Sequence, residues 1–248
     1  MTDWNAALAA KVAAIGSLAR TAQSFRTSYA GLLKKYHGGI PVNLLAAIAA
    51  IESSGRMIAG DASLGEYGFF QVAAQTERDF GVPTGTRTGP EGNIFLAALE
   101  YNVEALRLAL RYPIYVRSGS KGQWQLARLV FAIGRHGADL CLQAAIAGGF
   151  VGAGEGFAGV VRWADSTGAV AIGGSEAAKI RYRVKLVEVT QRVADALGLE
   201  GAGAPQQVPA PAGMVYTLPK DVAGKLPAAA AGGLILVAIA AVALYLWV

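Results

Sequence analysis

One apolar stretch that ends in an acid decides the fold of this chain: Ile40-Pro41-Val42-Asn43-Leu44-Leu45-Ala46-Ala47-Ile48-Ala49-Ala50-Ile51-Glu52-Ser53-Ser54-Gly55. Its apolar residues recur at helical spacing, Pro41 suits a first helical turn, and Gly55 suits an end. Glu52 is therefore predicted in the last turn, where the helix macrodipole favours cations. Helix stability does not explain an acid there, so Glu52 is a candidate functional residue.

A carboxyl group at the mouth of an apolar helix can keep its proton near neutral pH, because burial disfavours the charged form. Such a group can act as a general acid. The alternative for Glu52 is an ordinary solvated acid at a helix end. The segments that follow it in the sequence favour the functional interpretation.

Three later segments carry this interpretation. Gly65-Glu66-Tyr67-Gly68-Phe69-Phe70-Gln71 comes first, and Leu126-Ala127-Arg128-Leu129-Val130-Phe131-Ala132-Ile133-Gly134 is a second apolar helical stretch. The third is Ile180-Arg181-Tyr182-Arg183-Val184.

With Glu52-Ser53, these segments resemble the lytic transglycosylases of the lysozyme superfamily, which include soluble lytic transglycosylases and are related to goose-type lysozymes. The resemblance covers about residues 38 to 197. Gly65 to Gln71 is similar to the Gly-Leu-Met-Gln motif that lines the sugar cleft. Leu126 to Gly134 is similar to the helix that ends in Ala-Tyr-Asn-Ala-Gly, with Phe131 in place of the Tyr and Ala132 in place of the Asn. Asn93 resembles the residue that braces the cleft floor.

The resemblance implies a mainly α, lysozyme-like fold and cleavage of bacterial peptidoglycan. Glu52 would protonate the glycosidic oxygen and then take the proton from the sugar 6-hydroxyl, which closes a 1,6-anhydro ring. This chemistry requires that Glu52 holds a proton and pairs with no cation. The implied substrate-binding residues are Ser53, Gly68, Phe69, Gln71, Phe131 and Tyr182.

Two alternatives remain open. Glycosidases usually use two carboxylates, so a second acid facing Glu52 would favour a hydrolytic muramidase. Glu66 is the foremost candidate, although a structural role, bonding to loop backbone or pairing with Arg56, is favoured for it. Asp61 and Asp79 are expected to be solvated acids. Because Phe131 and Ala132 lack polar groups of the family, the second alternative is a catalytically weak structural or wall-binding protein.

Composition excludes several classes of site. Two histidines and one cysteine cannot form a zinc site of the usual spacing, so no metal and no cofactor are expected. The net charge of +5 suits anionic peptidoglycan and membrane surfaces. The basic residues are too dispersed to indicate a nucleic-acid partner.

The chain divides into four predicted parts. Residues 1–37 form an amphipathic helical segment, whose apolar stripe packs on the domain or on a virion or envelope protein. Residues 38–198 form the lysozyme-like domain, and 199–227 a Pro/Gly/Ala-rich linker. Residues 228–248 carry no charge and are long enough for a single transmembrane helix, with Tyr245 and Trp247 at an interface. A buried core helix is the alternative there.

Localisation is predicted from the same region. Lys220 and Lys225 precede the anchor, and the positive-inside rule would leave the main domain in the cytoplasm. No secretory signal pattern opens the sequence. A bacteriophage enzyme in a virion membrane would reconcile these features with a cell-wall substrate, and a bacterial cell envelope is the other expected location.

Overall fold

The computed structural model describes residues 3–112, 114, 119–152, 155–166, 177–198, 203 and 206–223. These residues form helices and no strand, with isolated antiparallel bridges at Ala59–Tyr67 and Tyr67–Val72. The mainly α prediction is confirmed.

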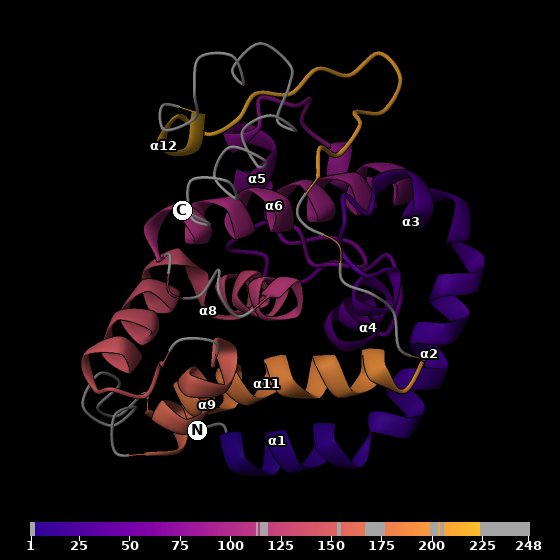
Figure 1. The fold of residues 1–248 in the computed structure, drawn as a ribbon. Helices are drawn as coiled ribbons and strands as arrows, with labels where there is room; N and C mark the ends of the chain where they lie inside the picture. Colours follow the sequence, from indigo (N-terminus) through magenta and orange to yellow (C-terminus); the bar gives the residue numbers. More distant parts are fainter. Residues whose placement is uncertain are drawn as a thin grey trace.

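The elements are arranged around a central helix (Figure 1). In chain order they are α1 (Trp4–Ala13), α2 (Ile15–Ser28), α3 (Ala30–Tyr36), α4 (Val42–Ser53), α5 (Ala74–Asp79), the 3-10 turn η1 (Thr86–Thr88), α6 (Pro90–Arg111), α8 (Gly119–Ala147), α9 (Phe157–Asp165), α11 (Ala177–Asp195) and α12 (Lys220–Ala223).

The central helix is α4, the predicted apolar helix that ends in Glu52. Every residue from Asn43 to Ile51 is buried, because α2 and α11 pack against it. Pro41 precedes the first turn as predicted, and the helix ends at Ser54 and Gly55, both at positive φ (57° and 69°). A helix that is apolar on all sides must be enclosed, and α4 lies in the larger of two buried apolar clusters among the described residues.

The N-terminal segment is helical as predicted, but it is part of the domain. It forms α1, α2 and α3, with breaks at Ala14 and Tyr29. Phe25 of α2 is buried, and its ring lies 4.8 Å from the ring of Phe69. Helix α1 packs on α11, α2 packs on α4 and α3 packs on α6. The segment before residue 38 therefore packs on the domain, one of the two surfaces expected for its apolar stripe.

Helix α8 crosses the domain and changes direction at Gly134, whose φ of 78° and ψ of 161° are not helical. Among the described helices, only its Lys121–Ala147 part is long and apolar enough to span a membrane, by length and composition alone. It packs on α6, α9 and α11 and contributes buried residues to the core. These contacts are those of a core helix.

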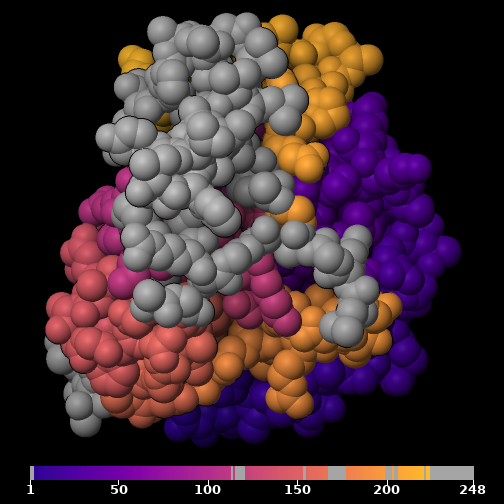
Figure 2. Space-filling model, in the orientation of Figure 1, coloured from indigo at the N-terminus to yellow at the C-terminus, as the bar shows by residue number. Residues whose placement is uncertain are grey.

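The segment 206–223 packs on the domain instead of forming a free linker. Val208 and Val222 are each 1% exposed, and the Thr217 amide donates to the Phe80 carbonyl (2.8 Å). Figure 2 shows this segment as the yellow-orange surface at the top, beside the indigo N-terminal part. Composition predicted a linker here and did not reveal that Val208 and Val222 are buried. The predicted anchor, 228–248, lies outside the described residues.

Candidate functional site

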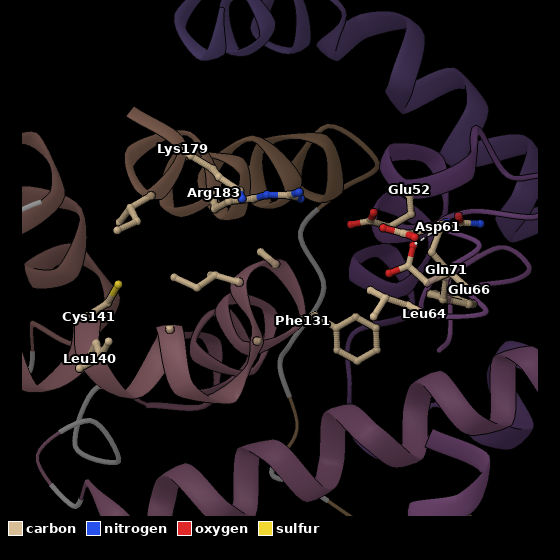
Figure 3. Close-up of a pocket in the computed structure, with 16 residues that line it drawn as sticks. Glu52, Asp61, Leu64, Glu66, Gln71, Phe131, Leu140, Cys141, Lys179 and Arg183 are labelled. Atoms are coloured by element: carbon tan, nitrogen blue, oxygen red, sulfur yellow. Dashed lines mark hydrogen bonds between the residues drawn. The ribbon is translucent and has the colours of Figure 1, made fainter. Parts of the chain in front are cut away.

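A cavity of about 820 Å³ opens beside the end of α4. Its walls come from α4, the loop between α4 and α5, α8 around the break at Gly134, and the first turns of α11 (Figure 3). The cavity brings together residues distant in the sequence, among them Glu52, Asp61, Glu66, Gln71, Phe131 and Arg183.

The Glu52 carboxylate lines the cavity, but it is not the isolated acid that was expected. It forms an ion pair with the guanidinium of Arg128 on α8. Arg128 is 1% exposed, whereas the Glu52 side chain is 22% exposed. The requirement that Glu52 pairs with no cation is contradicted, because α8 places a buried charge against the end of α4 and a buried cation needs a counter-charge.

Two unsatisfied polar groups lie beside this pair. The Nη1 group of Arg128 and the hydroxyl of Tyr101 are buried and have no hydrogen-bond partner among the described residues. The hydroxyl lies near Arg128 without meeting hydrogen-bond geometry, and burial, the largest effect, raises the pKa of Tyr101, so this group stays neutral. Tyr101 thus places a neutral hydroxyl group next to the buried cation that pairs with Glu52.

Glu66 is the acid in the cavity with the clearest tendency to keep its proton. Burial raises the pKa of Glu66, and the negative charges of Asp61 and Glu52 raise it further, against the backbone bond from Asp61 and the charge of Arg183. The expected bond to loop backbone is confirmed, since the Asp61 amide donates to Glu66 Oε2 (3.2 Å). The alternative pairing with Arg56 is not formed among the described contacts.

The other two candidate carboxylates have ordinary roles. Asp61 is exposed at the cavity rim, and hydrogen bonds from the hydroxyl and amide of Ser63 lower its pKa. Asp79 is outside the cavity lining and accepts a hydrogen bond from Gln75 (2.6 Å). Of the three candidates, Glu66 alone combines a place in the cavity with a raised pKa.

Gln71 and Phe131 line the cavity, as the resemblance implies. Gln71 has a positive φ of 52°, and its Nε2 donates to the carbonyls of Gly68 (2.7 Å) and Ile58 (3.2 Å). Phe131 stacks on Tyr101 with ring centroids 4.3 Å apart. Together they give the cavity an amide and an aromatic ring, two groups that bind sugars without adding charge.

Ser53 and Phe69 lie behind the cavity, so their expected contact with substrate is not supported. The Ser53 hydroxyl is buried, donates to the Phe69 carbonyl (2.9 Å) and accepts from the Arg56 amide (3.1 Å). Phe69 is 1% exposed, and its ring packs on Phe25 and Tyr29. Both residues hold the loop against the core, because the Phe69 carbonyl points toward α4 and accepts the Ser53 hydrogen bond.

The presence of glycine at position 68 also has a structural explanation. Its φ is +87°, and a Cβ there would lie 2.2 Å from the Asn93 amide. The space is needed by Asn93 and not by a sugar ring. Asn93 accepts from the Phe70 amide (3.2 Å) and donates to the Tyr67 carbonyl (2.9 Å), so the expected bracing of the cleft floor is confirmed.

Tyr182 faces away from the cavity lining. Its ring packs on Trp4 of α1 with centroids 5.1 Å apart, whereas Arg183, the next residue, lines the cavity. One residue on a helix is a rotation of about 100°. The predicted substrate contact of Tyr182 is therefore not supported, because Arg183 and not Tyr182 lies on the side of the helix that lines the cavity.

Arg128 and Arg183 are the site residues that sequence reasoning missed. A signal for Arg128 was present: a charge inside the apolar run 126–130 is seldom buried unless it is paired. No comparable signal marks Arg183, which is one of several basic residues in its helix.

A smaller cavity of about 160 Å³ shares Glu66, Gln71 and Phe131 with the first and is also lined by Glu100. Burial raises the pKa of Glu100 to about 7 from its ordinary 4.5, and the nearby Glu104 raises it too, against a hydrogen bond from Thr76. The folded protein therefore binds this proton more tightly than the unfolded chain. Stability from this group is complete below about pH 4.5 and is lost as pH rises through about 7.

Glu100→Gln is expected to remove this dependence, because the amide keeps the shape and cannot ionise. The variant should match the parent at pH 4 and exceed its free energy of unfolding by about 2 to 3 kcal/mol at pH 8. Urea unfolding at both pH values measures this difference. The same difference at both pH values would contradict the assignment.

Within the described part of the chain, no group of three or more His, Cys, Asp or Glu side chains is placed to hold a metal ion. The cavity has the size of a small-ligand site. It offers a carboxyl group that tends to keep its proton, a carboxylate held by a guanidinium, an amide and an aromatic ring. This set can protonate a leaving group and stabilise a developing positive charge.

No protein-family model, curated protein or solved structure matches this chain.

Proposed function

We propose that this protein cleaves peptidoglycan glycan strands at the β-1,4 bond between N-acetylmuramic acid and N-acetylglucosamine, in a lysozyme-like domain with Glu52 at the reacting centre. One observation carries the proposal. Glu52, Gln71 and Phe131 come from three separate segments and line one cavity, as the resemblance to lytic transglycosylases implies. A volume of about 820 Å³ suits a short run of sugar units.

The first candidate chemistry is lytic transglycosylation. Glu52 gives a proton to the glycosidic oxygen, and it then takes the proton from the 6-hydroxyl as the 1,6-anhydro ring closes. An ion-paired carboxylate carries no proton to give. Substrate binding must therefore separate Glu52 from Arg128 before this route begins.

The second candidate is hydrolysis, which the contacts of the two acids favour. Glu66 donates its proton to the leaving oxygen, while the charged Glu52 stabilises the developing positive charge on the sugar and water completes the reaction. The Arg128 pair holds Glu52 in the form that this route uses. Two carboxyl groups in different surroundings within one site are the usual arrangement for such a division of roles.

Mass spectrometry of digested peptidoglycan distinguishes the two routes. The full-length protein in detergent is incubated with purified sacculi, beside its Glu52→Gln variant. Anhydro-muropeptides that disappear in the variant support transglycosylation, and reducing-end products that disappear support hydrolysis. Folded protein that releases neither product would overturn the enzymatic proposal and leave a wall-binding role.

We also infer that residues 228–248 anchor the protein in a lipid membrane, either a virion membrane or the bacterial cell envelope. The full-length protein is expected to float with liposomes in a density gradient and to stay with them in high salt, because 21 uncharged residues bury enough apolar surface to hold it there. A chain that ends at residue 227 should remain at the bottom. Release of the full-length protein by salt would indicate electrostatic adsorption instead.

A further inference from the structure

Helix α11 carries four basic residues between 179 and 185, and they divide into two pairs. Arg181 and Lys185 are engaged by α9: Arg181 Nε donates to the Ala164 carbonyl (3.0 Å), and Lys185 Nζ pairs with Asp165 (2.7 Å). Lys179 and Arg183, four residues apart on one face of the helix, line the cavity. The helix thus presents a cationic wall to the cavity.

This cationic wall, Lys179 and Arg183, stands across from the acids. Figure 3 shows both side chains on α11, and the Arg183 side chain points across the cavity toward Glu52, Asp61 and Glu66. Among the described residues, no acid forms an ion pair with Arg183, although its charge acts on Glu66. The cavity therefore has an acidic part, where bond cleavage is proposed, and a basic part that the cleavage chemistry does not use.

The basic part fits an anionic group on the substrate. The sugar backbone of a glycan strand is neutral, whereas the peptide stem on N-acetylmuramic acid carries free carboxylates. A guanidinium can bind a carboxylate through two parallel hydrogen bonds, and an ammonium adds a second charge. Such a group at one end of the cavity would also fix the direction in which the strand lies.

We propose that Lys179 and Arg183 bind a stem-peptide carboxylate, so that the cavity selects peptide-bearing strands over bare glycan. This inference rests on the proposed function, because it names a second feature of the same substrate. Arg183 and Lys179 act as specificity determinants in binding, and the acids at the other end act on the glycosidic bond.

Binding to the full-length Glu52→Gln protein in detergent tests this without turnover. Calorimetry compares two oligosaccharides of equal length: one of alternating N-acetylglucosamine and N-acetylmuramic acid with tetrapeptide stems, and a bare one of N-acetylglucosamine alone, which has no carboxylate. The stem-bearing form should bind about tenfold more tightly, the effect of a charge-assisted contact. Added Lys179→Gln and Arg183→Gln should reduce its affinity to that of the bare form, and Arg183→Lys should keep most of it.

Arg192→Gln is the matched control, because it removes one positive charge from the same helix at an exposed position outside the cavity. It should leave both affinities unchanged. Equal affinity for the two oligosaccharides, or a loss with Arg192→Gln as large as with Arg183→Gln, would overturn the carboxylate subsite and leave glycan cleavage standing. Binding of neither oligosaccharide would overturn both proposals.

Discussion

Glu52→Gln is expected to lower the rate of muropeptide release by about a thousandfold. The amide has the shape of the carboxyl group, but it can neither give a proton nor carry a negative charge, so both candidate chemistries fail. Its carbonyl can still accept a hydrogen bond from Arg128, so the fold should survive. The measurement is the initial rate of release from purified sacculi, with thermal unfolding of both proteins to establish equal folding.

Two further variants sharpen this result. Asp79→Asn is the matched control, since Asp79 is an acid outside the cavity lining, and its rate should stay within about threefold of the parent. Glu66→Gln separates the routes: a loss as large as that of Glu52→Gln is expected for hydrolysis, and a small loss for transglycosylation. A Glu52→Gln protein that retains full activity would remove Glu52 from the reacting centre.

Arg128→Met is expected to lower the free energy of unfolding by about 3 kcal/mol. The guanidinium is 1% exposed and the Glu52 side chain 22% exposed, so the substitution leaves a carboxylate with only partial access to water. That partial access places the loss at the low end of values for broken buried pairs. Methionine fills most of the arginine volume, and urea unfolding measures the change.

Combining Arg128→Met with Glu52→Gln tests whether the two groups act as a pair. The double variant no longer has an unpaired Glu52 carboxylate, so its free energy of unfolding should be about 1 to 2 kcal/mol higher than that of Arg128→Met alone. Strict additivity of the two single effects would show that the ion pair contributes no coupling. The cause of the loss would then be altered packing around α8.

The sequence predicted those features of the fold and site that depend on neighbouring residues. The period of the apolar residues identified α4. The resemblance to lytic transglycosylases implied that Gln71 and Phe131 line one cavity with Glu52, and both do. The Arg128 contact joins residues 76 positions apart and depends on how α8 packs on α4. Local sequence patterns do not show which residues so far apart in the chain come into contact.

The errors have a common physical origin. The resemblance implied a substrate contact for Tyr182, but a helix with basic residues on several sides has no clear orientation in its sequence. The segments 1–37 and 206–223 were separated from the domain because composition describes a chain's local stiffness and polarity. It does not reveal which surface receives Phe25 or Val208, and both are buried in the same core.

The packing of residues 206–223 limits how far the site can stand from a bilayer. A free linker over 199–227 could extend by roughly 100 Å. Because Val222 is buried in the core, only residues 224–227 remain between the packed chain and the proposed anchor. That length reaches about 14 Å when fully extended. The domain would then rest almost on the lipid surface, and the glycan strands within its reach would be those nearest the membrane.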